Sequence, residues 1–92
     1  MAKVTDNQGM HRFEMMTSSQ TAFIDYWRSG EHIILIHTEL PEALEGQGIG
    51  SALVRGALDQ VKTTGLRVVP NCSFVAGYVE RNPEYQGLVA GS

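Results

Sequence analysis

The sequence has 92 residues, enough for a single domain. Hydrophobic residues make up 42% and charged residues 18%, which is typical of globular proteins and too apolar for a disordered chain. A formal net charge of −3 argues against nucleic-acid binding. A single cysteine, Cys72, excludes an internal disulfide, and no His/Asp/Glu spacing suggests a metal site. No apolar run approaches the roughly 20 residues that span a bilayer, and the N-terminus lacks an export signal, so we expect a cytoplasmic protein without membrane contact.

The first forty residues predict antiparallel strands joined by turns. Short strands are expected over His11–Met16 and Thr21–Trp27, and a turn at Arg28–Glu31 predicts a hairpin with the next strand. A turn near residues 7–9 indicates one further strand at the N-terminus. The aromatic residues Tyr26 and Trp27 are interpreted as sheet packing rather than as a binding platform.

The segment His32–Leu40 predicts a central strand, because its first half is apolar on both faces. Pro41 ends it, since proline has no amide proton. Strand side chains alternate, so two faces are expected. One face should carry Ile33, Leu35, His37 and Glu39, and the other Ile34, Ile36, Thr38 and Leu40.

Beyond Gly50 the apolar residues recur at helical spacing, and Gly65 is the expected C-cap of this helix. The strand Leu66–Val69 follows, so a right-handed crossover should make it parallel to the central strand. A last helix is expected over Ser73–Arg81. The predicted fold is therefore mixed α/β: an antiparallel meander, a β-α-β crossover and a short C-terminal helix. We expect one domain over residues 1–92, with an ordered core at about 4–86 and a frayed tail at 87–92.

A glycine-rich loop, residues 45–52, joins the central strand to the long helix and reads Glu-Gly-Gln-Gly-Ile-Gly-Ser-Ala. Glycines let a ligand approach the backbone, and the amides of a helix N-terminus attract phosphate. The alternative is a turn before a closely packed helix start. A P-loop is excluded because Gly50 is followed by Ser51-Ala52, and a dinucleotide fold is excluded because residues 66–70 contain no acid.

With three further segments, this loop resembles the GNAT superfamily of N-acetyltransferases. Gly48 and Gly50 match the two small positions of the acyl-CoA signature, whereas Glu45 stands where the family usually has Arg or Gln. The further segments are His37–Glu39, Val69–Phe74 and Asn82–Tyr85. Together they resemble the minimal, single-domain branch of the superfamily.

The resemblance implies that acetyl-CoA binds where the strands ending near Leu40 and Val69 splay apart. Backbone amides of the glycine loop would hold the pyrophosphate, and the free edge of the central strand would pair with the pantetheine arm. The implied binding residues are Thr38, Leu40, Glu45, Gly46, Gln47, Gly48, Ile49, Gly50 and Ser51. Most members carry two helices that wall the acceptor site, and Thr17–Gln20 is too short to hold them, so this site should be open.

Four residues are candidates for catalysis. His37 can accept a proton from an amine, and Glu39 can do so if burial raises its pKa; the alternatives are a core histidine and a solvated glutamate. Cys72 precedes a helix, where a thiol has a lowered pKa, and it could carry an acetyl group with His37 as its partner; the alternative is a small buried hydrophobe. Tyr78 stands at the family's spacing for protonating the leaving thiolate, although an aromatic here is usually core.

The predicted function is acetyl-CoA-dependent acetylation of a primary amine, either a small molecule or a protein lysine or N-terminus. Direct attack by the amine and a two-step route through acetyl-cysteine both remain open. The alternative function is a non-catalytic acyl-CoA-binding or adaptor module. We expect a monomer or a weak homodimer.

Overall fold

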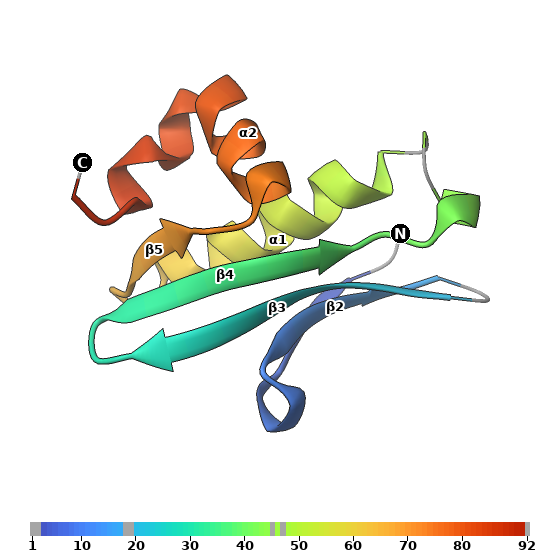
Figure 1. Ribbon diagram of the computed structural model, residues 1–92, viewed down its shortest axis with the longest axis horizontal. Coiled ribbons are helices and arrows are strands. Elements are labelled where there is room, and N and C mark those ends of the chain that lie inside the picture. The colour runs from blue at the N-terminus through green and yellow to red at the C-terminus, as the bar shows by residue number, and fades with distance from the viewer. Residues whose placement is uncertain (1–2, 18–19, 45, 47, 92) are drawn as a thin grey trace.

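Five strands form one sheet in the order β1-β2-β3-β4-β5 in the computed structural model, which describes residues 3–17, 20–44, 46 and 48–91 (Figure 1). The first four strands are antiparallel, and β5 is parallel to β4. The predicted meander and crossover are therefore confirmed. The strands are β1 (Val4–Asn7), β2 (Arg12–Met16), β3 (Thr21–Ser29), β4 (His32–Glu39) and β5 (Arg67–Pro70).

Two α-helices cover one face of the sheet. The crossover helix α1 (Ile49–Lys62) contacts β1, β2 and β3, and α2 (Ser73–Arg81) contacts β4, β5 and α1. The described residues also form short 3-10 helices at Gln8–Met10, Glu42–Leu44 and Pro83–Leu88. In the described part of the chain, no helix is long and apolar enough to cross a membrane.

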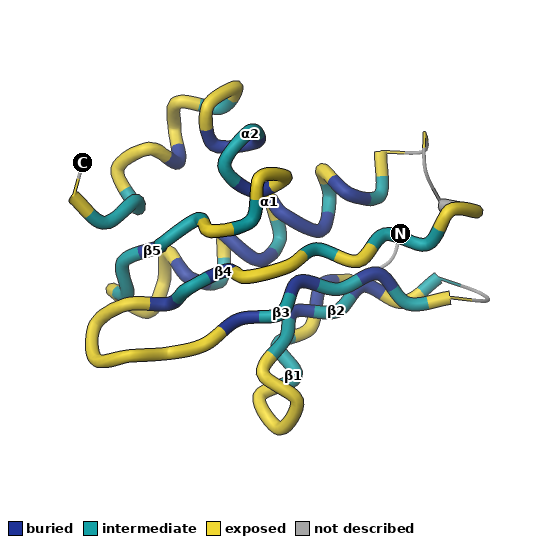
Figure 2. Tube along the Cα trace, in the orientation of Figure 1, coloured by how far each residue is buried: buried dark blue, intermediate teal, exposed yellow. Residues whose placement is uncertain are grey.

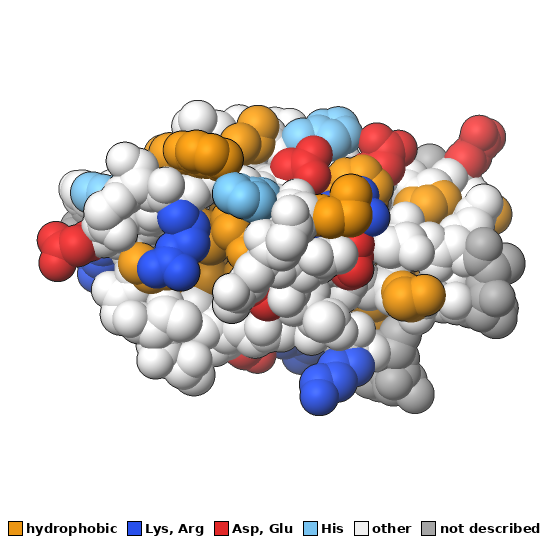
Figure 3. Space-filling model, turned by 90° about the horizontal axis from the view of Figure 1, so that it is seen from below, with side chains coloured by type: hydrophobic (Ala, Val, Ile, Leu, Met, Phe, Trp, Pro, Cys, Tyr) orange, Lys and Arg blue, Asp and Glu red, His pale blue; other side chains and the backbone are white. Residues whose placement is uncertain are grey.

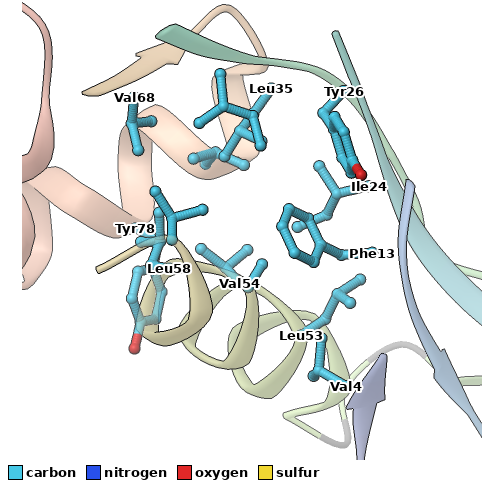
Figure 4. Packing of buried hydrophobic residues seen from close by; sticks show 14 of the residues in the cluster. Val4, Phe13, Ile24, Tyr26, Leu35, Leu53, Val54, Leu58, Val68 and Tyr78 are labelled. Atoms are coloured by element: carbon cyan, nitrogen blue, oxygen red, sulfur yellow. The ribbon is translucent and has the colours of Figure 1, made fainter. Parts of the chain in front are cut away.

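The core lies between the sheet and α1. Side chains of β2, β3 and β4 point toward α1, as the close view of Phe13, Ile24 and Leu35 shows (Figure 4). Leu53 and Val54 of α1 meet them and are fully buried. The dark-blue residues in Figure 2 alternate along the strands, as expected for a sheet covered on one face. Burial of this apolar surface is the main driving force for folding.

A β-bulge interrupts β4 at Ile36. Asp25 of β3 pairs with His37, and the next residue of β3, Tyr26, pairs with Leu35, so Ile36 has no partner of its own on β3. A bulge inserts one residue into the alternation and reverses the faces of all residues that follow it.

The bulge makes the expected assignment of faces wrong. Ile33 and Leu35 point into the core, but His37 and Glu39 lie on the opposite face, where no helix covers them. Thr38 pairs with the buried Ile24 and shares the face that the helices cover.

The C-terminal segment pairs with β5. Residues after α2 form the 3-10 helix Pro83–Leu88, and Val89 forms a bridge with Val68 of β5. The amide of Ala90 donates to the carbonyl of Val68 at 2.8 Å. Backbone pairing to β5 therefore extends as far as Ala90, and fraying of the predicted tail, residues 87–92, stays a prediction. Gly65 adopts a positive φ as expected, but α1 ends earlier and Thr63 is its C-cap.

Two buried tyrosines should make the protein less stable at alkaline pH. Burial, followed by a hydrogen bond to Asp6, raises the pKa of Tyr26 to about 12, and burial with a bond to Asp59 raises that of Tyr85 to about 12. Each pKa exceeds the ordinary value of 10.0, so the stabilisation is complete below pH 10 and is lost as the pH rises toward 12. Phenolate absorbance and unfolding midpoints measured across this range should show both effects. Ionisation of all three tyrosines near their ordinary pKa in the folded protein would contradict this prediction.

Candidate functional site

The parallel strands β4 and β5 separate at the carboxyl end of β5. Their pairing runs from His32↔Arg67 to Leu35↔Pro70, and the amide of Cys72 then donates to the carbonyl of Leu35 at 3.0 Å. Beyond this bond β5 turns away into α2, while β4 continues to Glu39 (Figure 1). Within the described residues, the β4 edge from Ile36 onward has no strand partner on the β5 side. An extended ligand can pair with such an edge.

Cys72 lies at this point of divergence and is the N-cap of α2. Its Sγ atom is 3.1 Å from the Oγ1 atom of Thr38 on β4. Burial raises the pKa of the Cys72 thiol, but hydrogen bonds from the Thr38 hydroxyl and from the amides of Val75, Phe74 and Thr38 outweigh it, so the pKa is lowered. The arrangement favours a thiolate, the nucleophilic form of cysteine.

The predicted partnership between His37 and Cys72 is not present. Because of the bulge, His37 projects from the uncovered face, and its Nε2 atom lies 3.0 Å from Oε1 of Glu39. Both side chains are more than half exposed, at 57% and 53%. The structure therefore brings together two pairs of candidates, Cys72 with Thr38 on the covered face and His37 with Glu39 on the other.

Replacing Thr38 with valine should raise the pKa of Cys72, because the substitution removes a hydroxyl that hydrogen-bonds to the sulfur. Cys72 is the only cysteine, so the pH dependence of alkylation by iodoacetamide reports on it alone. The midpoint of the rate profile should move to higher pH in Thr38→Val and stay unchanged in Thr5→Val, an exposed threonine on the edge strand β1. Equal midpoints in all three proteins would contradict this role of Thr38.

The N-terminus of α1 begins with a glycine that has no side chain to cap it. Gly48 is the N-cap in the left-handed conformation, with φ 75°, and Gly46 has φ 81°. An L-residue with a Cβ atom would be strained at both positions. The first amides of a helix have no intrahelical partner, and here no side chain of the N-cap bonds to them. Glu45 and Gln47, the other loop candidates, lie outside the described residues.

Gly50 serves packing rather than ligand approach. A Cβ atom built at this position would lie 2.5 Å from Cζ of Phe74, so the glycine lets α1 and α2 meet closely. Leu40 and Ile49 pack partly against the core, whereas Ser51 is exposed. Of the predicted binding set, Leu40 and Ile49 thus have side chains that are partly used in packing.

Tyr78 is a core residue. Its exposed fraction is 7%, and its ring centroid lies 5.9 Å from that of Tyr85. The hydroxyl of Tyr85 in turn donates a hydrogen bond to Asp59 of α1. These contacts favour the packing interpretation, and a role in protonating a leaving thiolate stays a prediction.

Trp27 and Tyr26, both expected to pack on the sheet, differ in exposure. Tyr26 is buried as expected, but Trp27 is 55% exposed on the uncovered face of the sheet. The His11 ring stacks on it, with centroids 5.0 Å apart and planes 19° from parallel. Neighbouring side chains of a strand point to opposite faces of the sheet. A buried Tyr26 therefore implies that Trp27 points outward, and the sequence could have indicated this.

A family model described as GCN5-related N-acetyl-transferase matches residues 12–88. The chain belongs to this family. This is the family that the sequence motifs resemble. The mixed sheet, with parallel strands that splay apart, is the fold expected from that resemblance.

Relatives and a solved structure agree with this assignment. The chain is 38% identical over 68 residues to Protein NATD1 of Gallus gallus and of Homo sapiens, an alignment that covers 73% of this chain. The alignment covers 62% and 60% of those proteins, so the chain spans about three fifths of their length. The NMR solution structure of a GCN5-like protein from Staphylococcus aureus aligns with a TM-score of 0.73 and 25% identity, covering 98% of this chain and 89% of the other.

Proposed function

We propose that the protein transfers the acetyl group of acetyl-CoA to a primary amine, with Cys72 as the acetyl carrier. The observation that carries this proposal is the Cys72–Thr38 pair at the point where β4 and β5 separate. A thiol with a lowered pKa, at a helix N-terminus and beside a free strand edge, is a suitable acceptor for an acyl group. Family membership supports the same class of reaction.

Backbone groups of the chain suit the nucleotide thiol. The uncapped amides at the start of α1, with the positive end of the helix dipole, would hold the diphosphate. Gly46 and Gly48 leave open space around the loop, since among the described residues no atom beyond their chain neighbours lies within 4 Å of a Cβ built on either glycine. The free edge of β4 around Thr38 would pair with the amide groups of the pantetheine arm, which brings the thioester toward Cys72.

The first step forms one bond and breaks another. The thiolate of Cys72 attacks the thioester carbonyl, a new carbon–sulfur bond forms on Cys72, and the bond to the sulfur of coenzyme A breaks. Coenzyme A leaves as a thiolate and takes a proton from water. Backbone amides of the splayed region would stabilise the negative charge that develops on the carbonyl oxygen.

In the second step the amine attacks the acetylated Cys72. A carbon–nitrogen bond forms, the carbon–sulfur bond breaks, and the thiolate of Cys72 is restored. The amine must lose a proton, and water would carry it to the His37 imidazole, which is paired with Glu39. His37 projects from the face of β4 opposite to Thr38, so it would act on an amine beside Cys72 only through water that passes the free edge of β4.

Release of free thiol from acetyl-CoA tests the proposal. The protein is incubated with acetyl-CoA and a pool of primary amines, and thiol release beyond one equivalent per protein should exceed the hydrolysis blank only when amines are present. Calorimetry with coenzyme A is run in parallel. Binding without amine-dependent release would instead favour the acyl-CoA-binding or adaptor module, which the open acceptor side of the sheet makes a reasonable second candidate.

A further inference from the structure

A cavity of about 210 Å³ opens between the sheet and the C-terminal end of α1. Phe13, Tyr26 and Ile33 line its sheet side, and Val61 and Leu66 line its helix side; we call it the helix-end cavity. The rings of Phe13 and Tyr26 lie side by side with centroids 5.0 Å apart, so the apolar floor is already packed (Figure 4). Cavities that hold drug-sized ligands measure roughly 300–1,000 Å³. The helix-end cavity therefore suits a smaller ligand with an apolar part.

The helix-end cavity lies away from the candidate acetyl site. Ile33 is near the start of β4, whereas Thr38, the partner of Cys72, lies five residues further along the strand. Five residues at roughly 3.3 Å each place the two positions about 16 Å apart. Within the described part of the chain, no candidate site residue lines this cavity. A ligand bound there would leave the free edge of β4 accessible.

Two charges of opposite sign border the helix-end cavity, Asp6 of β1 and Arg28 of β3. Burial raises the pKa of Tyr26, Asp6 raises it further and Arg28 lowers it, so both charges act on the hydroxyl of Tyr26. That hydroxyl donates to Oδ1 of Asp6 at 2.6 Å. None of the described residues forms an ion pair with Asp6 or Arg28. Both charges are therefore available to a ligand.

Arg28 also borders a second cavity, of about 190 Å³, on the side of His11 and Trp27. The two cavities share Gln8, Tyr26 and Arg28. Figure 3 views the molecule from the side without helices and shows a basic side chain beside a histidine and hydrophobic side chains, toward the end where the β3–β4 hairpin lies. Because Arg28 is exposed and has no ion pair with a described residue, its guanidinium loses no such partner when a ligand binds.

The pair of charges favours a zwitterionic ligand. A ligand with a single charge would be attracted by one of the two residues and repelled by the other, so the two effects would largely cancel. The carboxylate of a zwitterion can form two parallel hydrogen bonds with the guanidinium of Arg28. Its ammonium can bind the second carboxylate oxygen of Asp6, which accepts no hydrogen bond from a described residue. The C-terminal end of α1 borders the cavity at Thr63, and the negative pole of the helix dipole also favours an ammonium group.

We propose that the helix-end cavity is a binding site for a free α-amino acid with an apolar side chain, separate from the acetyl-transfer site. The apolar side chain packs on Phe13 and Leu66. The carboxylate binds Arg28 and the ammonium binds Asp6. This site does not depend on the proposed function, since none of these residues takes part in the reaction.

Titration with L-phenylalanine, followed by nuclear magnetic resonance of the backbone amides, tests this site. We expect saturable shifts at Arg28, Thr64 and Leu66, which line the cavity, and an unmoved amide at Cys72. Phenethylamine lacks the carboxylate and 3-phenylpropanoate lacks the ammonium, so each should bind about tenfold more weakly or worse. An analogue that binds as tightly as L-phenylalanine, or a titration without saturable shifts at the cavity, would overturn the proposal.

Two variants test the charges one at a time. Arg28→Gln should weaken the binding of L-phenylalanine by about tenfold without weakening that of phenethylamine. Asp6→Asn keeps an oxygen that can accept from the Tyr26 hydroxyl, and it should weaken L-phenylalanine but not 3-phenylpropanoate. Arg55→Gln and Asp25→Asn are the matched controls, since neither residue lines either cavity. The same affinity for L-phenylalanine in Arg28→Gln as in Arg55→Gln would contradict the proposed site.

Discussion

Replacing Cys72 with alanine should lower amine-dependent release of coenzyme A by about a thousandfold or more, because the substitution removes the proposed nucleophile. Binding of coenzyme A should change little, since the diphosphate and the pantetheine arm are expected to contact backbone groups of α1 and β4 rather than the sulfur. The measurement is the rate of thiol release at saturating acetyl-CoA, together with the dissociation constant of coenzyme A from calorimetry.

The neighbouring Ser73 provides the matched control. It is exposed and begins α2, so Ser73→Ala changes the same turn of chain without touching a reacting atom. This variant should keep nearly full activity. If Cys72→Ala also kept full turnover, the amine would attack the thioester directly, and the two-step route would be wrong.

Replacing Leu53 with alanine should lower the free energy of unfolding by about 2–5 kcal/mol, a large share of the ~5–15 kcal/mol that stabilises a typical domain. Leu53 is fully buried in α1 and faces the sheet beside Phe13 and Val4 (Figure 4). The substitution removes buried apolar surface and leaves a cavity that close-packed neighbours fill only in part. Urea denaturation followed by circular dichroism measures the change.

Arg55→Ala is the control for this prediction. Arg55 is an exposed residue of the same helix, and alanine is an equally good helix former. Its free energy of unfolding should differ from that of the original protein by about 0.5 kcal/mol or less. Comparable losses in both variants would show that α1 does not pack on the sheet as described.

Local patterns predicted most of the fold. The helical spacing of apolar residues after Gly50, followed by a β-branched strand, correctly indicated the crossover of α1 and β5. The hydrophobic run at Ile33–Ile36 correctly indicated a central strand. The pairing of the C-terminal segment with β5 could not be predicted in this way, because it joins Val89 to Val68, a contact distant in sequence.

The candidate site was only partly predictable, and the reason is the bulge at Ile36. The sequence correctly placed His37 and Glu39 at the end of a strand. Strict alternation of side chains, however, assigned both residues to the wrong face of the sheet. Nothing in the segment Ile-Ile-Leu-Ile-His-Thr-Glu marks an extra residue, since the bulge arises from pairing with β3. The position of Cys72 at the start of a helix was predictable, whereas its contact with Thr38 followed only from the reversed face.

The structure of the glycine loop was likewise only partly predictable from the sequence. Left-handed backbone at Gly48 agrees with the interpretation of an open helix start. At Gly50, however, the requirement for glycine comes from Phe74 on α2, a contact that no local pattern reveals. The packing interpretation therefore applies to Gly50, and phosphate binding at the start of α1 stays a prediction.

Mass spectrometry of the intact protein after incubation with acetyl-CoA alone tests the acetyl-carrier role of Cys72 most directly. We predict a mass increase of one acetyl group, which peptide mapping assigns to Cys72 and which disappears when an acceptor amine is added. An unmodified protein that still acetylates the amine, or an adduct that persists on Cys72 in the presence of the amine, would contradict that role.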